Sequence, residues 1–319
     1  MTLKSLEKMN TIILGAAGFI GTNLALGLSK STNNNIVLVD RNQDKLKRLQ
    51  SLCEKNVSVQ ESHLKPGMDF TELLMGQDIV YQLVSSTVPA TSNLRIPKEI
   101  SDNVILMSEL LEACVRCNVK KVIFLSSGGT VYGIKNRCPM KEENETYPIN
   151  SYGTQKVMNE KLLYLYQYLY GLDYRIIRLA NPFGPYQKPN GVQGVVAAFV
   201  YKALQRQEII VYGDGSAIRD YIYIEDAVRA IINIADYEGE DKLFNVGSGK
   251  GTSIHQLLKI IKHILGVELK ISYQPGRAMD VPVNFLDISK YEEKFGKMNS
   301  VSLENGIKRT VDFQRKKYF

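Results

Sequence analysis

The sequence contains few cysteines, and they do not form a recognisable framework. Cysteine occurs four times among 319 residues, as Cys53, Cys114, Cys117 and Cys138. A small secreted scaffold held by disulfides needs a much higher density, so that class of protein is excluded. Cys114 and Cys117 form a C-x-x-C pattern, but it lies in an amphipathic segment with no second pair and no nearby histidine. We therefore expect core packing there rather than a redox or metal site, and a reducing cytoplasm.

Long apolar runs, internal repeats and low-complexity blocks are also missing from the sequence. No run approaches the length of about 18 apolar residues that a membrane-spanning helix needs. The chain is 44% apolar and 23% charged, which is typical of an ordinary globular protein. Its 319 residues suffice for one large domain or for two smaller domains that share an interface.

The excess of basic residues is modest and is not concentrated in one place. Lys and Arg number 40 against 33 Asp and Glu, an excess of 7, which suits an anionic ligand and is compatible with nucleic acid or an anionic membrane. The densest basic cluster, at 315–317, has the character of a solvated tail. No recognition-helix or zinc-finger pattern is present, so we expect neither a nucleic-acid nor a membrane partner.

Short apolar runs alternate with longer helical patterns, and this order predicts the fold class. Strands are expected at 10–16, 35–40, 57–62, 78–83, 120–127 and 173–180, with helices at 20–30, 42–55, 100–117 and 152–170. The alternation predicts an α/β protein with a doubly wound parallel sheet, a Rossmann fold. Glycines, prolines and polar residues increase from Asn181 onward. We therefore predict a first domain over 1–180 and a smaller α/β substrate lobe over 181–319, with 218–250 returning to the sheet.

A glycine-rich turn follows the first predicted strand and opens the first helix. Gly15, Gly18 and Gly21 follow the pattern G-x-x-G-x-x-G, which lets a pyrophosphate approach the backbone and the helix N-terminus. Asp40 ends the second strand 19 residues after Gly21, where its carboxylate can accept hydrogen bonds from ribose hydroxyls. A 2′-phosphate would be repelled there, so NAD is favoured over NADP, although the adjacent Arg41 slightly weakens this argument.

Tyr152 and Lys156 form a Y-x-x-x-K pair on one face of a predicted helix. A free tyrosine has a pKa of about 10, so lowering it to about 7 requires about 4 kcal/mol. A lysine ammonium about 4 Å away supplies about that much at an effective dielectric of about 20. With a nicotinamide cation nearby, Tyr152 is predicted to remove a hydroxyl proton while a hydride leaves the same carbon.

Together these motifs resemble the extended short-chain dehydrogenase/reductase family, and within it the NAD-dependent nucleotide-sugar 4-epimerases of the UDP-glucose/UDP-galactose type. The resemblance covers nearly the whole chain. It implies that Asp69 and Phe70 hold the adenine, and that YQLVSST at 81–87 passes under the nicotinamide ribose. The residues implied to bind the cofactor are Gly15, Gly18, Phe19, Ile20, Gly21, Asp40, Asp69, Phe70, Leu83, Ser85, Tyr152 and Lys156.

Later segments of the chain resemble the substrate-binding motifs of these epimerases. RLANPFGPYQ places Asn181 at the substrate diphosphate, and GDGSAIRDYIYIEDAVRAI places Arg219 and Tyr221 at its phosphates. PGRAMDVPVNFLDISK supplies a second arginine clamp, Arg277, and guanidinium forks suit phosphate oxygens. Asn284, seven residues after Arg277, takes the place of a gatekeeper that is tyrosine in hexose-specific enzymes. Its smaller side chain predicts tolerance of an N-acetylhexosamine or a uronic acid.

The resemblance implies an enzyme that inverts C4 of a UDP-sugar through a transient 4-keto intermediate, with a dTDP-sugar as the alternative substrate. Tyr152 would take the proton of the sugar 4-OH while NAD takes the C4 hydride, and the hydride would return to the opposite face. The family often dimerises through two helices from each subunit, which would lie here at about 101–117 and 152–170. We therefore expect a homodimer.

Other activities of the same family remain as alternatives. Nucleotide-sugar 4,6-dehydratases carry the cluster T-D-E-V-Y-G, whereas this chain has Gly129 and Thr130 where the acids would lie. Related decarboxylases usually carry a glutamate there as well. A nucleotide-sugar reductase or dehydrogenase shares the first half-reaction. A non-catalytic dinucleotide-binding protein typically loses the tyrosine or the lysine of the pair, and both are present here.

The third catalytic group departs from the family pattern. In the family a serine or threonine, five residues before the glycine of V-Y-G, hydrogen-bonds the sugar 4-OH beside the tyrosine. The corresponding residue here is Gly128, within FLSSGGTVYG. Ser127 or Thr130 is the expected substitute, with Thr130 slightly preferred.

Overall fold

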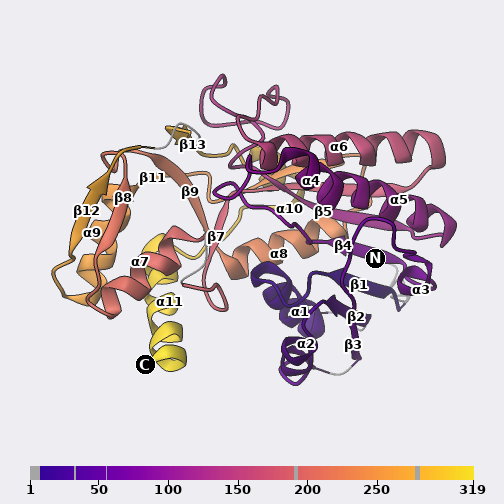
Figure 1. Cartoon of the computed structure of the whole chain (residues 1–319), viewed down its shortest axis with the longest axis horizontal. Helices are drawn as coiled ribbons and strands as arrows, with labels where there is room; N and C mark the ends of the chain where they lie inside the picture. Colours follow the sequence, from indigo (N-terminus) through magenta and orange to yellow (C-terminus); the bar gives the residue numbers. More distant parts are fainter. Residues whose placement is uncertain (1–7, 32–33, 55, 190–192, 277–280) are drawn as a thin grey trace. The chain divides into compact units, whose positions relative to one another are not determined.

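The structure of the protein is a computed structural model, and it describes residues 8–31, 34–54, 56–189, 193–276 and 281–319 (Figure 1). The chain divides into two compact units. The first comprises 1–86, 100–125 and 159–175, and the second comprises 87–99, 126–158 and 176–319. The domain boundary expected near residue 180 stays a prediction.

A seven-stranded parallel sheet is the main element of the fold. Its strands are β1 (Asn10–Leu14), β2 (Asn35–Asp40), β3 (Val57–Glu61), β4 (Ile79–Gln82), β5 (Lys121–Ser127), β6 (Asp173–Leu179) and β10 (Leu243–Val246). They lie in the order β10-β6-β5-β4-β1-β2-β3, which confirms the predicted Rossmann-type sheet. Ile12 of β1 pairs with Val37 on one side and with Val80 on the other. Ile12 is fully buried, as expected for a parallel strand covered on both faces.

The strand order reverses at β1, which lies between β2 and β4. The connection from β1 leads to β2 on one side, whereas β4 adds to the other side of β1. In open parallel sheets, ligands bind beyond the carboxyl ends of the strands at such a reversal. The glycine-rich turn after β1 and the segment after β4 therefore occupy the expected position for a cofactor.

The helices of the first unit largely follow the predicted pattern. They are α1 (Phe19–Ser31), α2 (Gln43–Gln50), α3 (Thr71–Leu74), a π-helical turn at Ser101–Ile105, α5 (Leu106–Arg116) and the later part of α6 (Ser151–Tyr170). The helix expected over 42–55 ends earlier, at Gln50. Two tight turns follow it, because Leu52 N donates to Leu49 O and Cys53 N donates to Gln50 O.

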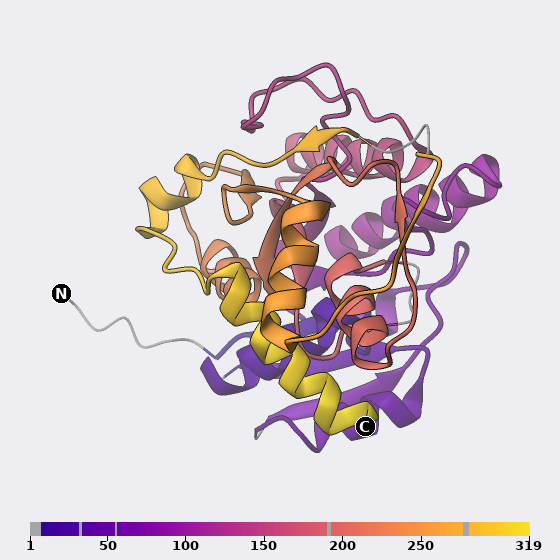
Figure 2. The ribbon, with the colours of Figure 1, turned by 90° about the vertical axis from the view of Figure 1, so that its left-hand side faces the viewer.

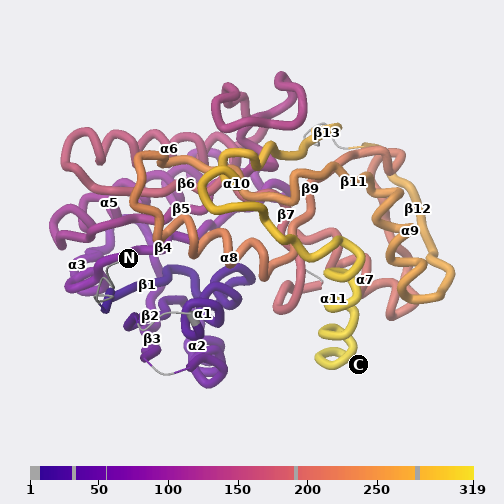
Figure 3. The backbone as a smooth tube through the Cα atoms, turned by 180° about the vertical axis from the view of Figure 1, so that it is seen from behind, coloured from indigo at the N-terminus to yellow at the C-terminus, as the bar shows by residue number. Residues whose placement is uncertain are grey.

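The second unit contains shorter strands and a helical cluster. Its strands are β7 (Asn181–Phe183), β8 (Ile209–Tyr212), β9 (Ile218–Tyr223), β11 (Gly251–Ser253), β12 (Ile271–Gln274) and β13 (Val283–Asn284). Its helices are α4 (Ile96–Ile100), α7 (Val195–Leu204), α8 (Ile224–Ala235), α9 (Ile254–Leu265), α10 (Ser289–Phe295) and α11 (Leu303–Tyr318), with the start of α6. Strand β9 pairs with β7, β11 and β13 (Figure 3). Strand β12 runs beside β8 (Figure 1). Helices α7, α9 and α11 pack together (Figure 2).

Among the helices of the described ranges, none combines the length and the apolar character that crossing a bilayer requires.

Candidate active site

The glycine-rich turn between β1 and α1 packs too closely for ordinary side chains. Gly15 adopts a φ of +86°, and a Cβ added there would lie 3.2 Å from Val84 Cγ2. A Cβ on Gly21 would overlap the carbonyl oxygen of Gly15. Gly18 is exposed, and a Cβ there would meet only that same oxygen, at 3.2 Å. The turn therefore presents bare backbone at the N-terminus of α1, where phosphate oxygens are favoured.

Asp40 ends β2 and supports the same turn. Its Oδ2 accepts a hydrogen bond from Ala17 N at 3.2 Å, and the residue is half-buried. A carboxylate can accept about four hydrogen bonds, so ribose hydroxyls can add to this contact. Phe19 and Ile20, also half-buried, form the first residues of α1. Bare backbone beside a helix N-terminus and an acid at the next strand fit the pyrophosphate and the ribose of NAD.

The other residues expected at the cofactor differ in exposure. Asp69 is exposed, and its Oδ1 accepts a hydrogen bond from Thr71 N at 2.9 Å. Hydrogen bonds from the Thr71 side chain and backbone lower the pKa of Asp69. Phe70 is only 1% exposed and belongs to the core. Leu83 is half-buried, with its N donating to Leu14 O, and Ser85 is exposed.

Tyr152 and Lys156 lie in the second unit, in the first two turns of α6. They share one helix face, and Lys156 Nζ lies 5.5 Å from the centroid of the Tyr152 ring. Lys156 is 7% exposed. The structure therefore brings the Y-x-x-x-K pair together as the spacing predicts, with a buried ammonium beside the ring.

The start of α6 is held by a local N-cap residue and by a second side chain from farther along the chain. Asn93 Oδ1 accepts a hydrogen bond from Ser151 N at 2.7 Å. Asn150 Oδ1 accepts one from Gly153 N at 2.8 Å. Asn93 itself adopts a φ of +83°, a conformation that asparagine tolerates better than most residues. These contacts satisfy two backbone donors of the first turn and fix the part of the helix that carries Tyr152.

The protonation of Tyr152 differs from the sequence-based expectation. Burial raises its pKa to about 12, while a hydrogen bond with the Ser127 side chain lowers it. The expected fall to about 7 is thus not met by the chain alone, because removing the phenol from water disfavours tyrosinate more than its neighbours favour it. A bound cation adjacent to the phenol would act in the opposite direction.

Ser127 and Thr130, the two candidate hydroxyls, occupy different environments. Ser127 ends β5 and hydrogen-bonds the Tyr152 side chain. Thr130 is 8% exposed, and its Oγ1 has no hydrogen-bond partner among the described residues. Thr130 packs against α6, since a Cβ on Gly153 would lie 3.0 Å from Thr130 O. Of these two hydroxyls, the one that hydrogen-bonds the phenol is therefore that of Ser127.

The residues expected at the substrate cluster around β9 and β13. Asn181 Nδ2 donates to Asp220 O at 2.9 Å, and Arg219 Nη1 donates to Ile218 O at 2.8 Å. Tyr221 is 5% exposed, burial raises its pKa, and its hydroxyl has no partner within the described part of the chain.

Asn284 is fully buried, and its Nδ2 donates to Gly128 O at 3.1 Å. Its Oδ1 has no partner among the residues that the structure describes. Arg277, the other predicted clamp, lies outside the described residues. The structure therefore brings Asn284 to the turn that follows Ser127, and it does not test Arg277.

Asp220 is a functional candidate that the sequence reasoning did not single out. Its carboxylate is fully buried and accepts hydrogen bonds from Ser248 N (2.7 Å), Ser248 Oγ (2.6 Å), Gly249 N (3.2 Å) and Leu286 N (3.3 Å). Burial raises its pKa, and these hydrogen bonds oppose the rise. An acid within the otherwise apolar stretch DYIYI was the available signal. Asp220 joins the strand that carries Arg219 to the segment that carries Asn284.

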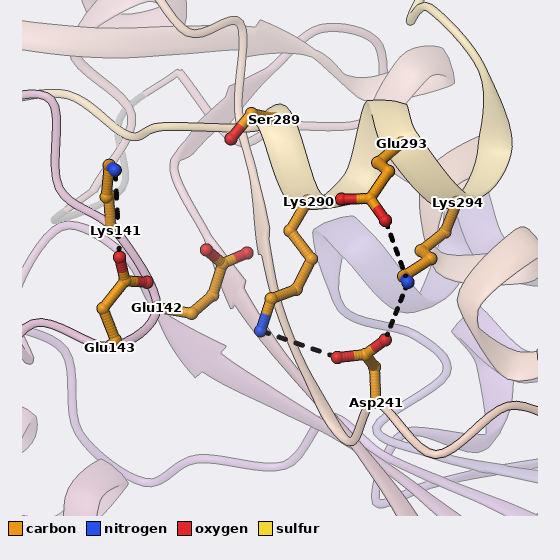
Figure 4. A pocket seen from close by; sticks show the side chains of 8 residues that line it. All are labelled: Lys141, Glu142, Glu143, Asp241, Ser289, Lys290, Glu293 and Lys294. Carbon is orange, nitrogen blue, oxygen red and sulfur yellow. Dashed lines mark hydrogen bonds and ion pairs between the residues drawn. The ribbon is translucent and has the colours of Figure 1, made fainter.

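A separate pocket in the second unit, with a volume of about 220 Å³, is lined mainly by charged side chains (Figure 4). Asp241 forms ion pairs with Lys290 (3.8 Å) and Lys294 (3.4 Å). The buried Glu142 accepts a hydrogen bond from Asn245 N at 2.8 Å, and burial raises its pKa. The two ion pairs of Asp241 therefore join α10 to the segment that precedes β10.

Comparisons with known proteins agree with this geometry. A model of the NAD dependent epimerase/dehydratase family matches residues 11–247. UDP-glucose 4-epimerase of Mycolicibacterium smegmatis is 33% identical over 97% of this chain and 99% of its own length. A dTDP-4-dehydro-6-deoxyglucose reductase of Escherichia coli is 31% identical over 96% of this chain and 97% of its own.

Among solved structures, UDP-glucose 4-epimerase of Thermotoga maritima with UDP-glucose superposes with a TM-score of 0.87. It is 34% identical, and the match covers 97% of this chain and 99% of that one. The family match spans the glycine-rich turn, Asp40 and the Tyr152–Lys156 pair. The chain therefore belongs to the NAD dependent epimerase/dehydratase family.

Proposed function

We propose that the protein is an NAD-dependent epimerase that inverts C4 of a UDP-sugar through a transient 4-keto intermediate. The observation that carries this proposal is the phenol of the half-buried Tyr152, hydrogen-bonded to the Ser127 side chain, with Lys156 on the same helix face. Two relatives that align with 97% of this chain are named UDP-glucose 4-epimerases. NAD, when bound, supplies a reversible hydride acceptor. The protein's own residues must bind the sugar, orient its 4-OH and move one proton.

Tyr152 is the proposed base for the 4-OH proton, and Ser127 is its proposed hydrogen-bond partner. The hydroxyl of Ser127 can donate to the phenolate that forms when Tyr152 loses its proton, which favours the charged form. Lys156 supplies positive charge beside the ring and lowers the energy of the same anion. Gly129 and Thr130 offer no carboxylic acid, so the chain lacks the group that a dehydratase uses for elimination.

The proposed substrate site consists of Asn181, Arg219, Tyr221 and Asn284, with Arg277 as a further clamp. Asn181 and Asn284 both reach the turn that contains Gly128 and Gly129: Asn284 bonds Gly128 O, and Asn181 Oδ1 lies 3.9 Å from where a Gly129 Cβ would stand. A UDP-sugar is the proposed ligand class, with a dTDP-sugar as the alternative. The amide of Asn284 supports the acceptance of N-acetylhexosamines or uronic acids.

A reductase is the second candidate, because the Escherichia coli relative that aligns over nearly the whole chain carries that activity by name. It would consume a reduced cofactor with each turnover, whereas an epimerase would not. The two candidate activities therefore differ in whether reduced cofactor is consumed, and not in which residue transfers the proton.

A homodimer in a reducing cytoplasm is also part of the proposal. In the first unit, α6 exposes Tyr164 (59%), Leu165 (43%), Tyr168 (77%) and Leu169 (54%). Their spacing places them on one helix face, and contiguous exposed apolar surface is typical of an interface. The four cysteines are free thiols, which suits a reducing compartment. Sedimentation of the purified protein tests the dimer.

The function is tested by incubating the purified protein, without added NAD, with UDP-glucose, UDP-N-acetylglucosamine, their uronic acids and dTDP-glucose. NMR of the sugar should show the C4 epimer, without release of NADH. A 4-keto-6-deoxy product would indicate a dehydratase. Oxidation of added NADH with a dTDP-4-keto-6-deoxy sugar as the substrate, together with no epimerisation of the other nucleotide sugars, would indicate a reductase. Turnover of UDP-glucose with none of UDP-N-acetylglucosamine would contradict the role given to Asn284.

A further inference from the structure

Gly128 has no room for a side chain, and Leu286 is the main reason. A Cβ added at Gly128 would lie 2.6 Å from Leu286 Cδ1 and 3.0 Å from Arg178 O. Heavy atoms at 2.6 Å overlap, so one of them has to move. At the next position the situation is reversed, because a Cβ on Gly129 would find no heavy atom closer than 3.9 Å. The two adjacent glycines thus differ in what a side chain would meet.

Leu286 cannot move aside easily. It is fully buried, and its N donates to Asp220 Oδ2 at 3.3 Å. The backbone on either side is fastened to Met140, which donates to Phe285 O (2.9 Å) and accepts from Asp287 N (2.7 Å). A rotation of the Leu286 side chain would therefore take place inside a packed core, where shifts of even one methylene are felt.

The peptide that follows Ser127 is held from both sides. Gly128 N donates to Leu179 O at 2.8 Å, and Gly128 O accepts from Asn284 Nδ2 at 3.1 Å. Ser127 O accepts from Val131 N at 3.3 Å, which closes the turn. These bonds fix the direction in which the Ser127 side chain leaves the backbone, toward Tyr152.

We propose that Leu286 is a positioning residue that determines which hydroxyl serves Tyr152. By filling the space beside Gly128, Leu286 excludes a hydroxyl at position 128 and leaves that role to Ser127. This inference rests on the proposed function, since it concerns the proton transfer of Tyr152. The packing of Leu286 against Gly128 does not depend on that function, so it can be tested separately by measuring the stability of the protein.

The packing step is tested by a double-mutant cycle in thermal stability. Gly128→Ala should lower Tm by about 3–10 °C, as expected for overpacking of a core site. In a Leu286→Ala background the same substitution should change Tm by no more than about 2 °C. Gly129→Ala, the matched control, should leave Tm within about 2 °C of the unmodified protein. If Gly128→Ala proved as mild as Gly129→Ala, the inference would be overturned.

The positioning step is tested by asking where the hydroxyl is needed. Ser127→Ala should lower kcat about 10- to 100-fold, the range for losing a hydrogen bond to a charged group. The fall should persist in the Leu286→Ala background, where position 128 still lacks a hydroxyl. In the double variant Gly128→Ser/Leu286→Ala, adding Ser127→Ala should change kcat by less than about 3-fold, since the new hydroxyl takes over.

The pH profile of kcat/KM supplies a readout that a purely structural role would not move. Ser127→Ala should raise the pKa at which activity appears on the acidic limb of the profile, since Tyr152 must lose its proton to act as a base, and the shift should disappear in the triple variant. An equal loss from Ser127→Ala in every background would refute the positioning role. If the unmodified protein turned over no nucleotide sugar, the proposed function would fail while the Tm cycle still decided the packing step.

Discussion

Replacing Asp220 tests whether one buried carboxylate joins β9 to the segment around Leu286. Asp220→Ala removes the acceptor for three backbone N–H groups and one hydroxyl. Ser248 Oγ can still bond Lys250 O (3.4 Å), whereas Leu286 is fully buried and cannot turn its N–H to water. An unpaired buried donor costs about 1–3 kcal/mol. Together with the other weakened bonds, we expect a loss of about 3–5 kcal/mol in the free energy of unfolding.

A loss of that size corresponds to a fall in Tm of about 6–15 °C for a protein of this length. Thermal melts followed by circular dichroism measure it directly. Ser248→Ala is the matched control, since it removes the hydroxyl contact and keeps the N–H donors, and it should lower Tm by no more than about 4 °C. A melt of Asp220→Ala within 2 °C of the unmodified protein, by the same scale, would refute the reasoning.

The difference in Tm between Asp220→Ala and the unmodified protein is expected to depend on pH. Burial raises the pKa of Asp220 above its unfolded value, so over the interval between the two values the folded state holds the proton and the unfolded state has lost it. The group therefore contributes stability that is fully present below the unfolded pKa and is lost as pH rises through the folded pKa. Asp220→Ala lacks this contribution, so the difference in Tm between the two proteins should widen as pH falls through that interval.

Three further predictions address the catalytic helix and the turn before it. Tyr152→Phe should lower kcat by at least about 10³-fold, because the proton acceptor is lost, while cofactor binding, followed by fluorescence quenching, persists; full activity would exclude Tyr152 as the base. Thr130→Val should keep kcat within about 3-fold and raise Tm slightly, since it removes a buried hydroxyl without a partner; a large fall in kcat would reassign the hydroxyl. Gly133→Ala should severely destabilise the protein, because Gly133 has a positive φ and a Cβ there would overlap the carbonyl oxygen of Tyr147. Gly76→Ala shares the positive φ and meets no atom within 4 Å, so equal Tm values for the two variants would contradict this reasoning.

The sequence predicted the features that depend on local patterns. Buried strands such as β1 are continuous apolar runs, and the glycine-rich turn is recognisable because its positive φ and close packing demand glycine. Tyr152 and Lys156 were predictable as neighbours because helix geometry alone brings i and i+4 together. These features need no knowledge of the rest of the chain.

The features that sequence reasoning missed depend on distant contacts. The pKa of Tyr152 reflects burial, which no motif encodes. The role of Asp220 depends on Ser248 and Leu286, which approach it only in the folded unit. From the sequence alone, Gly128 was only a departure from the family pattern. The structure gives a reason for the glycine, because a Cβ at position 128 would lie 2.6 Å from Leu286 Cδ1.

The contact between Gly128 and Leu286 also constrains the order in which mutations can accumulate during evolution. A serine at position 128 would be harmful while leucine is present at 286, and it becomes acceptable only after a smaller residue has arisen there. The reverse path passes through a glycine-and-small-residue intermediate with a cavity, which is destabilised yet free of a clash. Homologues should therefore show covariation of the two positions, with a large residue at 286 found only where 128 is glycine. An ancestor that gained its leucine first would be committed to the hydroxyl of the preceding residue.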